Sequence, residues 1–162
     1  MKSGELTLDR FDFRLLQCLA QDARLTQAEL ASRLHLSASA CGRRLQRLSE
    51  RGIIRRFRAE LDRRALGYGT LVIVRIALER QNEECLKAFE RAIVLCSSVL
   101  SCYLMSGSSD YLVTVAARDL DDFERVHNAE LSRLPHVARI ESSFALREVV
   151  NRELAPHMLG GT

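Results

Sequence analysis

The stretch LSASACGRRLQRLSERGII, residues 36–54, predicts a short helix with two contrasting faces. At about 100° per residue, Cys41, Leu45 and Leu48 fall within about a quarter of the helical wheel and form an apolar stripe. The same helix carries four arginines that are expected to point away from that quarter: Arg43, Arg44, Arg47 and Arg51. Because Glu50 is the only acid in the stretch, this face is nearly pure guanidinium. A face of one charge repels itself unless it has a partner, and a polyanion is the partner that its charge favours.

Two helices are predicted ahead of this one. Apolar residues recur at helical spacing between residues 8 and 19, and TQAE at 26–29 is a capping box that begins the next helix. Ser37 is a candidate N-cap for the basic helix, and Gly52 can adopt the left-handed conformation that ends it. Two short helices across a tight turn, the second of them basic, predict a helix-turn-helix over residues 1–54.

The charge of the chain is divided unevenly along its length. Residues 1–66 contain 14 Lys and Arg against 8 Asp and Glu, a balance of +6, whereas residues 67–162 contain 10 against 13, a balance of −3. This division predicts one basic module that faces a polyanion and a second module with a different partner. The hydrophobic content of 47% and the charged content of 28% are typical of a folded globular protein and exclude a disordered chain.

The sequence offers no set of metal-binding or catalytic residues. The five cysteines include no C-x-x-C pair and the four histidines lack metal-ligand spacing, so we expect no disulfide framework, metal site or cofactor. No P-loop, G-x-S-x-G or H-E-x-x-H motif is present. The longest apolar run, residues 92–105, has 14 residues with three serines and is too short to span a membrane. We therefore expect a cytoplasmic location, no membrane partner and no catalytic residue.

The hydrophobic pattern changes after the helix-turn-helix. Residues 53–61 are predicted to be an extended wing or linker strand. The patterns that follow predict strands at 71–79, 99–105, 111–117 and 137–146, and helices at 86–96 and 120–134. Strand-helix-strand twice over predicts a ferredoxin-like βαββαβ sheet, whose bare face is open to a second copy. Four parts result: the helix-turn-helix (1–54), a linker strand (55–69), the ferredoxin-like module (70–150) and a tail (151–162) with mobile last residues.

This order of modules resembles the Lrp/AsnC (feast/famine) family of bacterial and archaeal transcription regulators. The resemblance is carried, between residue 6 and about residue 150, by LTLDRFDFRLLQCLAQDARLTQAELASRLHLS, ACGRRLQRLSERGIIRRF, CYLMSGSSDYLV and LPHVARIESSFALREV. It implies an α+β chain: an N-terminal winged helix-turn-helix and a C-terminal ferredoxin-like (RAM/AsnC-type) effector module. It also implies a homodimer built from the C-terminal modules, often assembled into tetramers or octamers. The implied partners are double-stranded DNA and an amino acid or similar small metabolite, bound between C-terminal modules near the hairpin after the second strand.

The candidate DNA-binding residues lie on the basic helix and just beyond it. Arginine pairs with guanine O6 and N7 or clamps a phosphate, and we expect Arg47 and Ser39 to contact bases. Three arginines are expected to hold phosphates, a role that depends on salt concentration. The candidates are Ser37, Ser39, Arg43, Arg44 and Arg47 on the helix, with Arg51, Arg55 and Arg56 as the phosphate contacts. The alternative is an ordinary solvated charged face.

One glycine lies inside the basic helix. Gly42 costs about 0.5–1 kcal/mol there relative to alanine. Close approach of another backbone, close approach of DNA, and a merely tolerated defect are the three explanations that the sequence leaves open.

The candidate effector site is the loop SGSSDY, residues 106–111, which matches the family's Ser-Gly-x-x-Asp-Tyr hairpin. Gly107 allows a positive φ, and exposed amides nearby are able to hold a carboxylate. Asp110 either binds an α-ammonium group or caps the turn. Family members often have an aromatic residue where Ser109 stands, which leaves the ligand open. The candidate residues are Gly107, Ser108, Ser109, Asp110 and Ser142, the last of which either faces the same pocket or is a plain strand position.

Three functions are compatible with these sequence features. The first is a sequence-specific transcriptional regulator whose DNA binding is modulated by an amino acid or related metabolite. The second is a DNA-compacting protein of the same family that responds to no ligand. The third is an enzyme similar to the siroheme decarboxylases, which share this architecture; the arginine face and the absence of clustered histidines argue against it.

Overall fold

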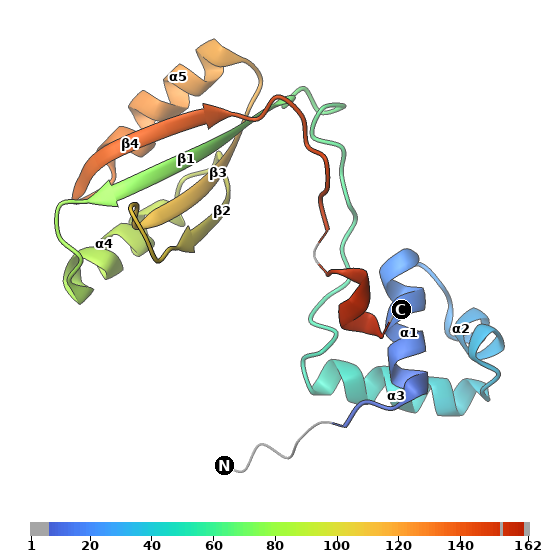
Figure 1. The fold of residues 1–162 in the computed structure, drawn as a ribbon. Helices are drawn as coiled ribbons and strands as arrows, with labels where there is room; N and C mark the ends of the chain where they lie inside the picture. The colour runs from blue at the N-terminus through green and yellow to red at the C-terminus, as the bar shows by residue number, and fades with distance from the viewer. Residues whose placement is uncertain (1–6, 153, 161–162) are drawn as a thin grey trace. The chain divides into compact units, whose positions relative to one another are not determined.

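The structure is a computed structural model that describes residues 7–152 and 154–160 (Figure 1). Its described residues form two compact units. The first, here called the helical unit, contains the described residues up to Glu60 and those from Val150 onward. The second, here called the sheet unit, is Leu61–Val149.

Three helices form the helical unit: α1 (Arg10–Gln21), α2 (Gln27–Leu34) and α3 (Ala38–Glu50). Capping side chains mark where all three begin, and the sequence predicted two of these caps. The Thr26 hydroxyl accepts from the Glu29 amide and the Glu29 carboxylate accepts from the Thr26 amide, which confirms the predicted capping box. The Ser37 hydroxyl accepts from the Ala40 amide at 3.2 Å, so Ser37 is the N-cap of α3 as predicted.

The apolar stripes of the three helices meet in one core. Its fully buried members, each no more than 1% exposed, are Leu15, Leu30, Leu34, Cys41 and Leu48. Gly52 follows α3 with a φ of 70°, and the Ile53 amide donates to the Leu48 carbonyl at 2.9 Å. The predicted helix-turn-helix is therefore confirmed in its helices, its turn and the end of α3.

The predicted linker strand at residues 55–69 is wrong for this chain. Residues 55–62 have no regular secondary structure and residues 63–67 form a turn, in which the Tyr68 amide donates to the Arg63 carbonyl at 2.8 Å. A strand requires a neighbour for its backbone groups, and none of the strands in the described ranges pairs with this segment.

The sheet unit has the predicted ferredoxin-like topology. The strands are ordered β2-β3-β1-β4 and every neighbouring pair is antiparallel. The last helix is shorter than predicted, since a 3-10 turn at Leu131–Arg133 follows it and buries Leu131 in the core. In chain order the elements are β1 (Thr70–Leu78), α4 (Glu83–Ile93), β2 (Val99–Leu104), β3 (Tyr111–Ala117), α5 (Leu120–Ala129) and β4 (Val137–Phe144).

The sheet has one covered face and one open face. Helices α4 and α5 lie on the covered face (Figure 1). There, alternate residues of β1 and β3 share a core with Phe89 of α4 and Phe123 of α5. Half-buried apolar residues lie on the other face, where Tyr103 is exposed. Its apolar members include Leu71, Ile73 and Leu112.

The end of the chain belongs to the helical unit. The short 3-10 helix η2 (Pro156–Leu159) packs on α1, and the Gln17 amide group donates to the Leu159 carbonyl at 2.8 Å. The sequence predicts a tail with mobile last residues, of which residues 161 and 162 lie outside the described residues; residues 154–160 are held against α1 by this contact.

The structure supplies a reason for Gly42 that the sequence left open. A Cβ atom at Gly42 would lie 2.6 Å from Nε2 of Gln27, which crosses α3 there to donate to the Ala38 carbonyl at 2.6 Å. Gly42 therefore makes room for a side chain of α2, and the Gln27 contact joins the two helices of the helix-turn-helix.

We predict that Gly42→Ala alone leaves the stability nearly unchanged. Alanine gains about 0.5–1 kcal/mol of helix propensity but displaces the Gln27 amide, whose hydrogen bond contributes a similar amount, about 0.5–1.5 kcal/mol. In a Gln27→Ala background, Gly42→Ala should stabilise by about 1 kcal/mol. Urea unfolding of the four chains in this double-mutant cycle measures the difference, and equal effects in both backgrounds would contradict the role given to Gly42.

Candidate functional site

The N-terminal end of α3 presents an exposed polar surface. Ser37 and Ser39 lie there with their hydroxyl oxygens 3.2 Å apart, and Arg43 is exposed one turn further along. Gln46, which the sequence pattern did not single out, lies on the same side of the helix three residues after Arg43 and donates to the Glu50 carboxylate at 2.8 Å.

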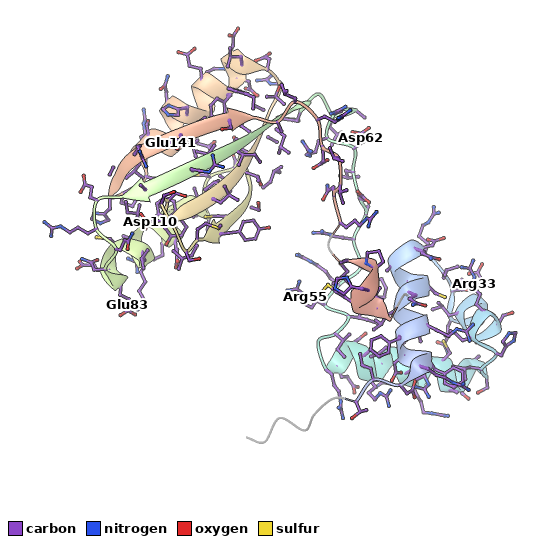
Figure 2. The ribbon with its side chains drawn as sticks, viewed as in Figure 1. Arg33, Arg55, Asp62, Glu83, Asp110 and Glu141 are labelled. Carbon is purple, nitrogen blue, oxygen red and sulfur yellow. The ribbon has the colours of Figure 1, made fainter. Side chains whose placement is uncertain are left out.

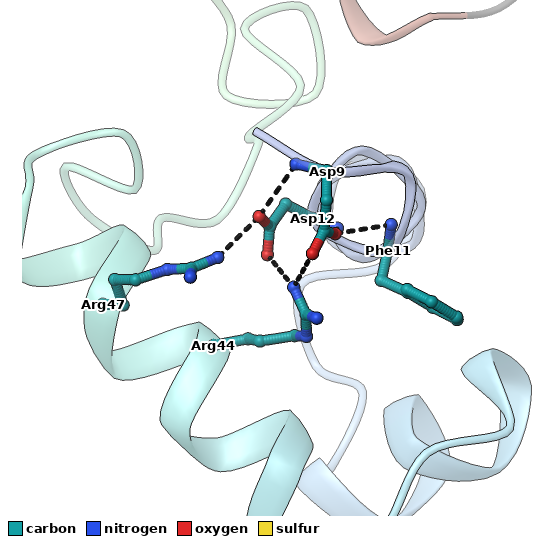
Figure 3. Close-up of polar contacts among 5 residues, drawn as sticks. All are labelled: Asp9, Phe11, Asp12, Arg44 and Arg47. Atoms are coloured by element: carbon teal, nitrogen blue, oxygen red, sulfur yellow. Dashed lines mark hydrogen bonds and ion pairs between the residues drawn. The ribbon is translucent and has the colours of Figure 1, made fainter. Parts of the chain in front are cut away.

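Two of the four arginines are held by Asp12 of α1 and by Asp9, the N-cap of that helix (Figure 3). Nη1 of Arg44 lies 2.6 Å from Oδ2 of Asp9 and 2.7 Å from Oδ1 of Asp12. Nη2 of Arg47 lies 2.6 Å from Oδ2 of Asp12. The expectation that the whole arginine face lacks an acidic partner in its own chain is therefore wrong for Arg44 and Arg47.

Helical geometry explains this correction. At about 100° per residue, Arg44 lies about 60° from Cys41 and borders the apolar stripe, so its side chain runs along the contact with α1. The side chain of Arg44 is 23% exposed and its guanidinium lies over the Phe11 ring, 5.5 Å from the ring centroid. Arg47 is 44% exposed and reaches the same acid from the edge of the helix.

Asp12 is the centre of these contacts. Its side chain has no exposed surface, and it accepts from Arg44, from Arg47 and, at 3.1 Å, from the Asp9 amide. Its position in the sequence carried a signal that was missed: Leu8, Asp12, Leu15 and Leu19 share one helical stripe, so an acid stands on the buried face. A buried carboxylate requires charged or polar partners, and such a position predicts a basic residue across the interface.

The same contacts stabilise the charged forms of both partners. Partial burial acts to raise the pKa of Asp9, but hydrogen bonds from the Asp12 amide and the Arg44 guanidinium outweigh it and hold that pKa below its ordinary value. Hydrogen bonds to Asp12 and then to Asp9 raise the pKa of Arg44. Asp9 and Arg44 are therefore both ionised at neutral pH.

The other four candidate arginines are exposed, and none of the four has an acidic partner within the described ranges. Arg43 is on α3, Arg51 caps its C-terminal end, and Arg55 and Arg56 follow in the irregular segment (Arg55 is labelled in Figure 2). These four side chains, with Ser37 and Ser39, are here called the basic surface.

A pocket of about 250 Å³ lies where the hairpin after β2 meets the start of α4. It contains the predicted residues Gly107 and Asp110, and Gly107 has the expected positive φ, 138°. Gln81 and Leu86 were missed because they come from an earlier part of the chain than the loop, and Leu104 and Met105 because they directly precede the loop, at the end of β2. Its lining residues are Gln81, Leu86, Leu104, Met105, Ser106, Gly107 and Asp110.

Asp110 caps the hairpin from inside the sheet unit (Figure 2). The residue is buried, and its Oδ2 accepts from the Leu78 amide at 2.7 Å. Its own amide donates to the Ile76 carbonyl at 2.9 Å, and its carbonyl accepts from the Met105 amide at 2.8 Å. Asp110 thus holds the hairpin to the end of β1.

The other predicted effector residues do not line this pocket. Ser108 and Ser109 are in the same loop but outside the lining. Ser142 is on β4, where it pairs with Val74 of β1, and β4 lies on the opposite side of β1 from β3. The backbone amides of residues 106–109 donate to no protein group in the part of the chain that is described. These amides are therefore available to an anionic group.

Neither a metal centre nor a membrane span is present in the described ranges. Among those residues, no three His, Cys, Asp or Glu side chains come together as metal ligands. None of the helices there is long and apolar enough to cross a membrane.

The fold, the basic surface and the pocket beside Asp110 define a DNA-binding helix-turn-helix joined to a ligand-binding module. A family profile described as "Winged helix-turn-helix DNA-binding" matches residues 8–55, and one described as "Lrp/AsnC ligand binding domain" matches residues 71–155. The chain belongs to the Lrp/AsnC family of transcriptional regulators.

Individual relatives agree over nearly the whole length. The chain is 38% identical to the Bkd operon transcriptional regulator of Pseudomonas aeruginosa over 149 residues, 92% of this chain and 97% of the relative. It is 34% identical to the leucine-responsive regulatory protein of Rhizobium meliloti, over 88% of this chain and 91% of the relative. A transcriptional regulator from Neisseria meningitidis, solved with L-methionine, superposes with a TM-score of 0.88 at 32% identity, over 94% of this chain and 99% of that one.

We predict that Asp110→Ala destabilises the sheet unit by about 1–3 kcal/mol, because it leaves the buried Leu78 amide without an acceptor. Asp110→Asn retains an acceptor oxygen and should recover most of that loss. Urea unfolding of the three chains measures the effect. Equal stability of Asp110→Ala and the wild-type chain would contradict the capping role.

Proposed function

We propose that this protein is a sequence-specific transcriptional regulator whose DNA affinity changes when an amino acid or related metabolite binds the sheet unit. The observation that carries the proposal is the basic surface, because its four arginines are exposed and have no acid of their own described chain. A duplex supplies the phosphates and base edges that this surface lacks.

The exposed residues divide into two roles in this proposal. Ser39 and Arg43 lie toward the N-terminal end of α3 and contact base edges in the major groove. Arg51, Arg55 and Arg56 lie at and beyond its C-terminal end and hold phosphates. Arg44 faces α1 and supports the helix from behind.

The pocket beside Asp110 is the proposed effector site. A volume of about 250 Å³ suits a molecule of amino-acid size. The open amides of residues 106–109 receive the α-carboxylate, and Asp110 attracts the α-ammonium group. Leu86, Leu104 and Met105 line the side available to an apolar side chain. The L-methionine complex of the Neisseria meningitidis regulator supports this assignment.

The open face of the sheet supports a homodimer. The proposed DNA partner places this homodimer in the cytoplasm. A second copy placed on this face would bury Leu71, Ile73 and Leu112. A dimer presents two copies of α3 to half-sites about one helical turn, or a multiple of it, apart. Effector binding then acts by changing how copies assemble, including into tetramers or octamers, and linkage requires DNA and effector to affect each other's affinity equally.

A DNA-compacting protein without an effector is the second candidate, since it requires only the basic surface and the open sheet face. The pocket and the L-methionine complex favour the regulated form. An enzymatic role finds no support, because the relatives described above are transcriptional regulators.

We predict that Arg43→Ala weakens binding to a duplex selected by the wild-type chain from a random pool by about 1–3 kcal/mol, which is about 5- to 150-fold. Arg91→Ala is the matched control, since it removes the same charge from an exposed position on α4. Fluorescence anisotropy at fixed salt measures both. Equal losses in the two variants would show that α3 does not read the duplex.

We predict that at least one of the twenty amino acids raises the melting temperature of the protein. A ligand at 100 times its dissociation constant stabilises by about 2.7 kcal/mol. Asp110→Asn should abolish the shift, because the neutral amide no longer attracts the ammonium group. If no amino acid shifts the wild-type melting temperature, the effector proposal fails and the DNA-compacting alternative is favoured.

A further inference from the structure

The contact between α1 and α3 does more than join two helices. Asp12 gives one carboxylate oxygen to each arginine: Oδ1 to Arg44 at 2.7 Å and Oδ2 to Arg47 at 2.6 Å. Arg44 also binds Asp9 at 2.6 Å. Two basic groups on the DNA-facing helix are therefore matched by two acidic groups of the same chain, and the four side chains together carry no net charge (Figure 3).

We propose that Asp12 is a specificity-determining positioning residue for DNA recognition. It withholds the charge of Arg44 and Arg47 from indiscriminate phosphate contact and fixes the direction in which Arg47 points. The inference rests on the proposed function, because it requires α3 to be the helix that meets the duplex.

The charge balance is the first argument. Each guanidinium that neutralises a phosphate releases counterions, and the slope of log affinity against log salt steepens by about 0.9 per contact. A buried carboxylate that already neutralises a guanidinium removes that gain on any duplex, whatever its sequence. Since the surface also contains Arg43, Arg51, Arg55 and Arg56, the chain still has enough cations for phosphates.

The exposure of Arg47 is the second argument. Its side chain is 44% exposed although Nη2 is bound to Asp12, and the other N–H groups of its guanidinium donate to no described protein group. A side chain fixed on one edge loses little conformational entropy when its other edge meets a base. Arg44 differs, since both acids bind it and Phe11 lies beneath it. Arg47 is thus a hydrogen-bond donor with a fixed direction, whereas Arg44 joins α3 to the start of α1.

The burial of Asp12 is the third argument. No surface of its side chain is exposed, so solvent and salt do not screen these contacts as they screen surface ion pairs. The direction of Arg47 therefore persists at the salt concentrations at which exposed arginines lose their phosphates.

The test uses Asp12→Asn in the full chain, with two probes of equal length: a duplex that the wild-type chain selects from a random pool and a random-sequence duplex. Anisotropy titrations between about 50 and 200 mM NaCl give the affinity and the salt slope on each. Asp12→Asn should steepen the slope on the random duplex by about 0.9 for each guanidinium it releases. The ratio of selected to random affinity should fall about tenfold, since random binding rises while Arg47 loses its direction.

A charge-matched variant separates this role from a loss of packing. In Asp12→Asn combined with Arg47→Gln, the released cation is removed, so the slope on the random duplex should return toward the wild-type value. An unchanged slope and an unchanged affinity ratio in Asp12→Asn, with a native circular dichroism spectrum, would overturn the proposal.

If Asp12→Asn does not fold, Arg47→Gln alone tests the proposed role of Asp12. Because Asp12 already neutralises Arg47, the slope on the random duplex should stay unchanged while affinity for the selected duplex falls. A slope shallower by about one on the random duplex would overturn the proposal. A wild-type chain that binds neither duplex, or selects no sequence, would overturn the proposed function itself.

Discussion

A carboxylate buried between two helices sets the geometry of the DNA-binding half of this protein. Asp12 has no exposed surface, and an isolated charge in that position would be strongly unfavourable. It is tolerated because Arg44 and Arg47 reach it from α3 and the Asp9 amide reaches it from α1. The two arginine contacts cross between the helices and specify their angle and register. Apolar packing around Leu15 and Leu48 stabilises the contact but has no comparable direction.

A second buried carboxylate has an equivalent position in the sheet unit. Asp110 ties the hairpin to the end of β1 through the Leu78 amide, and the pocket forms beside it. Both sites place an acid where backbone or guanidinium donors converge, and both leave a functional surface next to the tie. Asp110 belongs both to the contact with β1 and to the pocket lining, whereas Asp12 lies beneath the helix that carries the basic surface.

The sequence predicted most of the fold because its signals are local. Spacing of 3.6 and of 2 residues located the helices and strands, and the TQAE box and Ser37 located two helix starts. Contacts between distant residues were missed. Asp12 and Arg44 are 32 residues apart, Gln27 reaches Ala38 across α2 and α3, and Leu159 binds Gln17 from the other end of the chain. Each of these depends on how helices pack, which single-helix patterns do not encode.

The candidate site was predicted unevenly for the same reason. Exposed arginines are visible from helical spacing, whereas the ion pairs that Arg44 and Arg47 make with Asp12 depend on the position of α1. In the pocket, Gly107 and Asp110 were found from their loop, but Leu86 and Gln81 come from an earlier part of the chain. For Ser142 the sequence left open a place in the pocket and a plain strand position, and the strand order places it on β4, on the other side of β1 from β3.

The most direct measurement of the central claim is hydrogen–deuterium exchange of the intact protein with and without a selected duplex. Slower exchange is predicted in the first turn of α3 and in residues 51–58, with α4 and α5 unchanged. Protection confined to the sheet unit, with no change at the first turn of α3, would contradict the claim that this helix lies against DNA.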